Sequence, residues 1–189
     1  MITITPTEER KRSMDDDYLL QVFQKRRPSL NFTVPDFKCD AYYQESLQTL
    51  SLSDILQEYH SIILFFYERD FTNSAINDIL QVRECYKEFM DKKALPIMIS
   101  TDTAMVHRGF CSSSIQGGLN TVPEFPLLGD ATRLISRHFD VLENETGNAR
   151  RSVFVIDHHH KIKYSFMPLD SEQPYSMSVI LSMVSNITK

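Results

Sequence analysis

An apolar run at residues 62–67 is the feature that most constrains what this chain can fold into. A continuous apolar stretch of this length is typical of a central strand that is buried on both faces of a sheet. A short polar turn follows the run. Apolar residues then recur with helical spacing from Ile76 to Phe89, which predicts a helix over residues 74–92. A buried strand that leads through a short turn into a helix indicates an α/β fold.

Strand-like and helical segments alternate along the rest of the chain, and the last two predicted strands form a hairpin before a closing helix. This order predicts an α/β sandwich of thioredoxin type, in which helices flank a central mixed sheet. The other predicted elements are an extended segment at 31–43, a connecting element at 51–56, strands at 95–100, 152–156 and 162–166, and helices at 102–110, 132–139 and 173–186.

The N-terminal residues 1–29 are predicted to be an extension, and residues 30–189 a single domain. Within the extension, Leu19, Val22 and Phe23 share one face of a candidate short helix. An isolated helix of this length is marginal in water, so it needs a surface to pack against. That surface is either the protein's own domain or a partner protein, and the sequence leaves both open.

Charge and hydropathy exclude several classes of partner. The formal net charge is −5 at pH 7, which gives no overall attraction for nucleic acid. No apolar run approaches the roughly 18 residues that a membrane-spanning helix needs. The acidic stretch at residues 15–17 argues against a mitochondrial presequence. We therefore expect a cytoplasmic protein that binds neither nucleic acid nor membrane.

Cysteine and histidine patterns give no sign of a metal or cofactor. The three cysteines, Cys39, Cys85 and Cys111, form no CxxC pair. Cys85 is predicted to be buried on the apolar side of its helix, and Cys111 to be the most exposed of the three. Residues 158–160 are three histidines at a predicted hairpin turn. Alternate residues of a strand share a face, so only His158 and His160 could touch one metal ion together, and no third ligand is evident. A solvated turn is therefore expected.

Several separated motifs resemble segments of one known family and occur in that family's order. They are Pro-Asp-Phe at 35–37, Leu-Phe-Phe-Tyr at 64–67, Asp-Phe-Thr at 70–72, Ser-Thr-Asp-Thr at 100–103, Gly-Gly-Leu at 117–119 and Arg-Ser-Val-Phe-Val-Ile-Asp at 151–157. Over roughly residues 33–185 they resemble the typical two-cysteine peroxiredoxins of the thioredoxin-peroxidase type. The resemblance implies the thioredoxin fold and, in the family, reduction of peroxides by an active-site thiolate.

The resemblance also implies an active site that has lost its nucleophile in this chain. The family's attacking cysteine corresponds to Ala75, and the proline that shields its site corresponds to Glu68. Ile76 replaces a second proline. Two supporting positions are kept: Thr72 matches the family's threonine, and Arg151 matches the arginine that helps to lower the pKa of the thiol. A carboxylate at position 68 would raise the pKa of a neighbouring thiol.

A second cysteine of the family, which resolves the oxidised thiol, lies on an arm beyond the last helix. No cysteine follows Cys111 in this sequence. Both redox cysteines are therefore expected to be missing. The resemblance then implies a catalytically inactive, peroxiredoxin-like binding or structural module. It is expected to form a homodimer through edge strands, while assembly of dimers into rings and binding of a partner through the extension stay open.

Two alternatives stay open at this point. One is a working thiol peroxidase or redox sensor that uses Cys111 or Cys39 in place of the missing cysteine. The other is an engineered Cys-to-Ala form of an active thioredoxin peroxidase, in which Ala75 is the only change. The altered residues Glu68 and Ile76 argue against the second alternative, because a single substitution would leave its surroundings intact.

Overall fold

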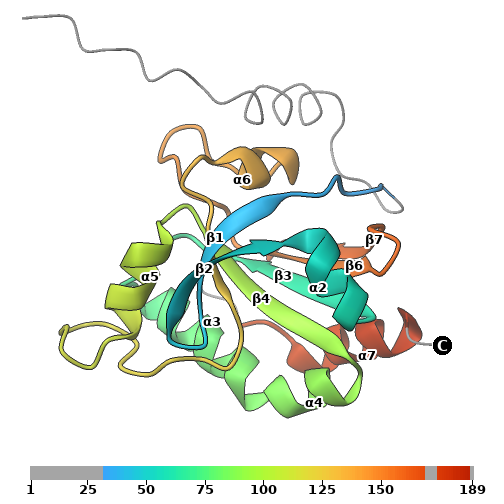
Figure 1. Ribbon diagram of the computed structural model, residues 1–189, viewed down its shortest axis with the longest axis horizontal. Coiled ribbons are helices and arrows are strands. Elements are labelled where there is room, and N and C mark those ends of the chain that lie inside the picture. Colours follow the sequence, from blue (N-terminus) through green and yellow to red (C-terminus); the bar gives the residue numbers. More distant parts are fainter. Residues whose placement is uncertain (1–31, 169–173, 188–189) are drawn as a thin grey trace, which may run out of the picture.

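The computed structural model describes residues 32–168 and 174–187 (Figure 1). The predicted extension at 1–29 lies outside the described residues. No helix within them is both long and apolar enough to cross a membrane. The strands are β1 Lys38–Tyr43, β2 Ser46–Ser51, β3 Ser61–Phe66, β4 Ala94–Ser100, β5 Leu127–Gly129, β6 Ser152–Asp157 and β7 Ile162–Phe166. The helices are α2 Leu52–Glu58, α3 Asn73–Glu84, α4 Tyr86–Asp91, α5 Ala104–Cys111, α6 Leu134–His138 and α7 Met177–Ile187.

All seven of these strands join one mixed sheet in the order β2-β1-β5-β4-β3-β6-β7. The central pairs β3–β4 and β4–β5 are parallel, whereas the outer pairs are antiparallel. Helices lie on both faces of the sheet (Figure 1). The thioredoxin-like fold with a mixed sheet, predicted from the sequence, is therefore confirmed.

Strand β3 lies at the centre of the molecule, and every one of its side chains is buried. Because successive side chains of a strand point to opposite faces, β3 contributes to two cores. Ile63 and Phe65 belong to the core under α3, α4, α5 and α7. Ile62, Leu64 and Phe66 belong to the core under α2 and α6. Burial on both faces explains why this segment is a continuous apolar run.

The segment 31–56 is more structured than its sequence predicts. It contains a hairpin, because β1 and β2 pair over their full length. The turn residues Gln44 and Glu45 both have positive φ, at 50° and 60°, as tight hairpin turns with a right-handed twist require. Neither residue is the glycine or asparagine that normally marks such a turn, so the sequence carried no signal. The expected connecting element is helix α2, capped by the Ser51 hydroxyl.

Two other predictions need correction. The single helix expected over 74–92 is divided at Cys85, whose φ of −96° and ψ of 3° interrupt the helix between α3 and α4. The apolar spacing continues across this break because both helices pack on the same core, so periodicity alone could not reveal it. Strand β5 was not predicted at all. It is only three residues long, and its pairing with β1 and β4 decides its conformation.

Candidate functional site

The start of α3, which follows β3 after a loop at residues 67–72, carries two of the residues that the family resemblance singled out. Thr72 is the N-cap, and its Oγ1 accepts a hydrogen bond of 3.2 Å from the backbone N–H of Ala75. The same hydroxyl donates to the Arg69 carbonyl oxygen at 3.1 Å. Ala75 is 1% exposed and belongs to the core. Thr72 therefore stabilises the turn, and the buried methyl group of Ala75 lies at the position that the resemblance assigns to the family's thiol.

Arg151, which immediately precedes β6, contacts Asp78 of α3 and Tyr175, a residue that precedes α7. Its Nε donates to Asp78 Oδ2 at 2.6 Å, and its Nη2 donates to Asp78 Oδ1, which forms a bidentate ion pair. The guanidinium carbon lies 4.1 Å from the centre of the Tyr175 ring, within the range of a cation–π contact. The side chain of Arg151 is 10% exposed.

Burial affects the two groups that surround this guanidinium. It raises the pKa of the Asp78 carboxyl, and the hydrogen bonds and charge of Arg151 offset part of that rise. Burial also raises the pKa of the Tyr175 hydroxyl. Because arginine stays protonated, the guanidinium is a permanent buried charge that Asp78 compensates. The positive charge that would lower a thiol's pKa in the family is thus already engaged by a carboxylate.

Glu68 lies at the surface beside the Arg151–Asp78 ion pair and lines two adjacent hollows. The larger has a volume of about 860 Å³ and the smaller about 440 Å³, and Ser74, Asp78 and Arg151 also line both. Asn148 Nδ2 donates to Glu68 Oε1 at 3.3 Å. The expected site residues Glu68 and Arg151 are therefore close neighbours, whereas the described hydrogen bonds of Thr72 stay within its own turn.

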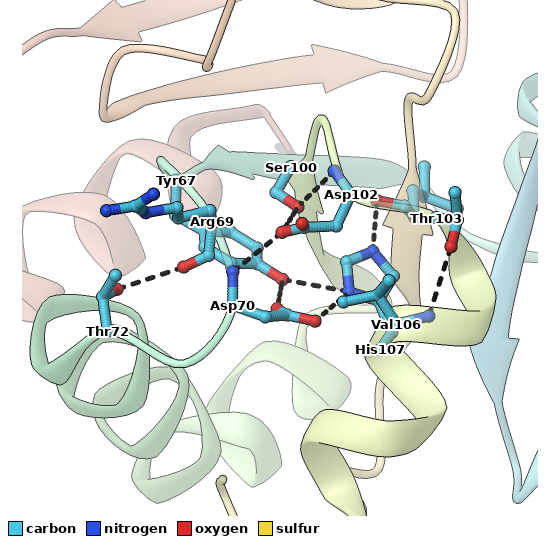
Figure 2. Close-up of polar contacts among 10 residues, drawn as sticks. Tyr67, Arg69, Asp70, Thr72, Ser100, Asp102, Thr103, Val106 and His107 are labelled. Atoms are coloured by element: carbon cyan, nitrogen blue, oxygen red, sulfur yellow. Dashed lines mark hydrogen bonds and ion pairs between the residues drawn. The ribbon is translucent and has the colours of Figure 1, made fainter. Parts of the chain in front are cut away.

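A buried polar network lies behind this turn (Figure 2). Asp70 stands between two side chains: its Oδ1 accepts from the Tyr67 hydroxyl at 2.7 Å, and its Oδ2 lies 2.8 Å from Nδ1 of His107. The other ring nitrogen of His107 lies 3.0 Å from the Leu128 carbonyl oxygen. Burial, followed by the nearby charge of Asp70, raises the pKa of Tyr67 well above its ordinary value.

The partners of His107 determine where the protons of this network reside. A backbone carbonyl only accepts hydrogen bonds, so Nε2 of His107 carries a proton and donates it to Leu128. Nδ1 faces the Asp70 carboxyl, so the two groups share one further proton. Both side chains are fully buried. The pair is therefore a compensated unit, and removal of either member leaves the other without its partner.

Two features of the backbone bring the parts of the network together. Asp102 fixes the turn that contains Asp70, because its Oδ2 accepts from the Asp70 N–H at 2.8 Å and from the Ser100 hydroxyl at 2.9 Å. Helix α5 approaches β5 closely: a Cβ on Gly129 would lie 2.5 Å from the Ala104 nitrogen. That approach places His107 against the carbonyl of Leu128.

None of the cysteines lines the hollows beside Arg151, and all three lie in environments that disfavour the thiolate. Cys39 and Cys111 are buried, and burial raises the pKa of both, that of Cys111 to about 12. Cys85 is only half-buried. The expectation that Cys111 is the most exposed thiol and Cys85 a buried one is therefore wrong. The end of α5 folds onto the core, whereas Cys85 stands at the break between two helices.

Three residues of the site were given no role from the sequence. Asp78 was not singled out, although it follows Ala75 by about one helical turn and therefore shares its buried face. Tyr67 and Asp70 were noted only as members of motifs that carry the family resemblance. Among the described residues, no group of three or more His, Cys, Asp or Glu side chains is placed to hold a metal ion.

Known proteins are similar to this chain in sequence and in fold. The profile of the AhpC/TSA family matches residues 30–165. A mitochondrial thioredoxin-dependent peroxide reductase from Drosophila melanogaster is 35% identical over 65% of this chain and 52% of its own length. A chloroplastic 2-Cys peroxiredoxin BAS1 from Spinacia oleracea is 30% identical over 73% of this chain and 52% of its own. The chain thus spans about half the length of these relatives.

Solved structures agree with this relationship at the level of fold. The reduced 2-Cys peroxiredoxin of Plasmodium vivax has a TM-score of 0.76, with 21% sequence identity, and the match covers 85% of this chain and 82% of that one. The family profile covers well over half of the sequence, and the fold is the one its members share. The chain therefore belongs to the AhpC/TSA family, the family of the peroxiredoxins.

Proposed function

We propose that this protein is a catalytically inactive peroxiredoxin-like module that acts by binding and self-association. The observation that carries the proposal is the buried methyl group of Ala75 in the first turn of α3, where the family resemblance places the attacking thiol. Thr72 and Arg151 persist around it, but the first caps the helix and the second is bound by Asp78. The proposed relic site comprises Glu68, Thr72, Ala75 and Arg151.

The state of the cysteines supports this proposal over a peroxidase or sensor that uses Cys39 or Cys111. The thiolate is the reactive form of cysteine, and a raised pKa makes it scarce at neutral pH. Burial raises the pKa of both thiols, and neither residue lines the hollows beside Arg151. Cys85 is more accessible, but burial and the nearby charges of Glu88 and Glu84 raise its pKa as well.

A peroxide-consumption assay tests the proposal directly. With thioredoxin and thioredoxin reductase as the electron source, the protein should oxidise NADPH no faster than a blank, while an active two-cysteine peroxiredoxin serves as the positive control. Robust turnover that thiol alkylation abolishes would contradict the proposal and support a reactive thiol in the native chain.

The variant Ala75→Cys separates a missing nucleophile from a degraded site. The new thiol would be buried in the core, and the guanidinium of Arg151 is engaged by Asp78, so the pKa of the thiol should stay high and its reaction with peroxide should be slow. Fast sulfenylation of the introduced thiol at neutral pH, followed by mass spectrometry, would instead favour an engineered form of an active enzyme. The double variant Ala75→Cys with Glu68→Pro measures how much the carboxylate contributes.

Self-association is the second part of the proposal, and the edge of the sheet supports it. Strand β7 is an edge strand in the described sheet, and its last residue, Phe166, is 44% exposed. Met167, which follows β7, and Val179, which lies on α7, are also exposed apolar residues. An exposed apolar edge strand offers unpaired backbone groups to a second chain. We infer that two copies pair along β7.

A further contact that would join dimers into rings involves the loop before α3. Phe71 is 44% exposed, adopts a positive φ of 58°, and packs its ring 5.1 Å from that of Phe110. A bulky side chain in that backbone region is strained, and such strain tends to accompany function. Ring formation stays a proposal, as do a cytoplasmic location and a partner bound through residues 1–29.

A further inference from the structure

A hollow unrelated to the relic site lies between the β1–β2 hairpin and helix α2. We call it the hairpin hollow. Its volume is about 310 Å³, enough for one side chain or a small ligand. The residues that line it include the aromatic Tyr43 and Tyr59, the acidic Asp54 and Glu58, and the apolar Leu95 and Pro126. The hollow therefore combines aromatic, acidic and apolar residues.

The two carboxylates are uncompensated in the part of the chain that the structure describes. Within residues 32–168 and 174–187, neither Asp54 nor Glu58 forms an ion pair with a lysine or arginine. Both residues are exposed at the rim of the hollow. The charge that the walls present to a ligand is thus negative, and a cation is the complementary ligand.

The aromatic groups of this region lie close enough to influence one another. Burial raises the pKa of Tyr59, and the neighbouring Tyr43 and Glu58 raise it further. Burial likewise raises the pKa of Tyr43, and Glu58 adds to that rise. Tyr43, Tyr59 and Glu58 therefore lie close together at the hollow that they line. At neutral pH both hydroxyls stay protonated, so a cation would meet neutral aromatic rings.

We propose that the hairpin hollow binds an alkylated ammonium group. Aromatic faces attract cations through the ring quadrupole, and this attraction is most useful for cations that are weakly hydrated. A bare ammonium is strongly hydrated and would lose water against Leu95 and Pro126, whereas methyl groups on the nitrogen make favourable contact with them. The ligand is either a small quaternary ammonium compound or the methylated lysine of a peptide, which share this chemistry.

Choline and its neutral isostere 3,3-dimethylbutan-1-ol test the role of charge. The full-length ¹⁵N-labelled protein is titrated with each compound, and amide shifts are followed by NMR. Choline should give saturable shifts for residues of the hairpin and α2, and the isostere should bind at least about fivefold more weakly. Equal affinity for the two compounds, or no saturable shift with choline, overturns the proposal.

Variants assign the binding to the named residues. Tyr59→Leu removes a π face and should weaken choline binding about fivefold, whereas Tyr59→Phe keeps the face and should retain binding. Glu58→Gln should weaken binding and reduce its dependence on salt. The matched control is Glu88→Gln on α4, which lies outside the hollow and should leave binding unchanged. Binding that Tyr59→Leu and Glu58→Gln leave intact, in protein with unchanged circular dichroism, overturns the assignment.

A trimethyl-lysine peptide and its unmethylated counterpart distinguish the sources of the ligand. Tighter binding of the trimethylated peptide than of choline indicates a protein ligand, and the reverse indicates a small molecule. Either result supports the shared chemistry. A preference for the unmethylated peptide contradicts it.

Discussion

Asp70 and His107 form a contact between two ionisable side chains that are both fully buried. The Tyr67 hydroxyl donates to Asp70 and also lies 3.4 Å from Nδ1 of His107, while the Leu128 carbonyl lies against the other ring nitrogen. Such a network stabilises the fold only while it is complete.

Replacement of Asp70 by asparagine should destabilise the protein by about 3 kcal/mol. The amide oxygen can still accept from the Tyr67 hydroxyl, but the amide is neutral and turns a donor toward Nδ1 of His107 in place of a carboxylate oxygen, so the shared proton loses its anionic partner. Urea unfolding followed by circular dichroism measures the loss. Asp91→Asn, the same change at an exposed position of α4, is the control and should cost little. A similar free energy for both variants would falsify this role of the network.

The cap of α3 gives a smaller effect. Thr72→Ala should lower the free energy of unfolding by about 1 kcal/mol, because the N–H of Ala75 loses its acceptor. Thr72→Ser keeps the hydroxyl and should restore most of the stability. Thermal and urea unfolding of the two variants make the comparison, and equal stability of both would show that the hydroxyl does not act as a cap.

His138 should make stability depend on pH. Burial lowers its pKa to about 4, from an ordinary value near 6.5. Between these values the unfolded chain binds more protons than the folded one, so this contribution to stability is complete above pH 6.5 and is lost as pH falls toward 4. The expected loss between pH 7 and pH 5 is about 2 kcal/mol.

Urea unfolding at several pH values, with His138→Phe as the variant, isolates this residue. The variant keeps an aromatic ring beside Phe32 and Phe139 but cannot be protonated. Its unfolding free energy should therefore fall less between pH 7 and pH 5 than that of the native protein. His158→Gln in the exposed β6–β7 turn is the control. Parallel pH profiles of the native protein and His138→Phe would exclude His138 as the source.

At the scale of the elements, the sheet has two edges of different character. Strand β2 presents mostly polar side chains to solvent, with Leu47 as an exception. Strand β7 ends at the exposed Phe166, and the exposed Met167 follows it. Helix α7, which contacts β6, carries a further exposed apolar residue, Val179. The described part of α7 also carries no charged residue. These differences favour β7 over β2 as the edge that pairs with a second copy.

Phe166→Lys should therefore convert the dimer to a monomer. A charge on an edge strand opposes pairing, because it would have to be desolvated in the interface. Light scattering coupled to size-exclusion chromatography gives the mass of each species. Leu47→Lys on β2 is the matched control and should leave the mass unchanged. A native chain that is monomeric, or a Phe166→Lys variant that stays dimeric, contradicts pairing through β7.

At the scale of the whole molecule, the sheet and its two cores are built from residue 34 onward in the described part of the chain. We therefore predict that residues 30–189 fold without the extension. A protein that lacks residues 1–29 should keep its far-UV circular dichroism and unfold cooperatively on heating. Loss of cooperative unfolding would instead show that the extension packs on the domain, whereas loss of a bound partner alone would assign it a docking role.

The sequence by itself determined the fold class and the position of most elements, and it led to the hypothesis that Ala75 stands at the position of the family's cysteine. Each of these depends on local information. The burial of 62–67 on two faces appears as a continuous apolar run, and the motif around Thr72 occupies a few consecutive residues. The hairpin turn at Gln44–Glu45 and the break at Cys85 escaped prediction because they are backbone conformations without a characteristic residue.

Only the tertiary structure decided what the retained residues do. Arg151 and Asp78 are 73 positions apart, and Asp70 and His107 are 37 apart. They meet because β3 pairs with β6 and β4, and because α5 approaches β5 at Gly129. Register and close packing fix such contacts to within a few ångströms, whereas sequence spacing constrains only neighbours on one element. For the same reason the hairpin hollow, assembled from β1, β2, α2, β4 and the segment before β5, was visible only in the folded chain.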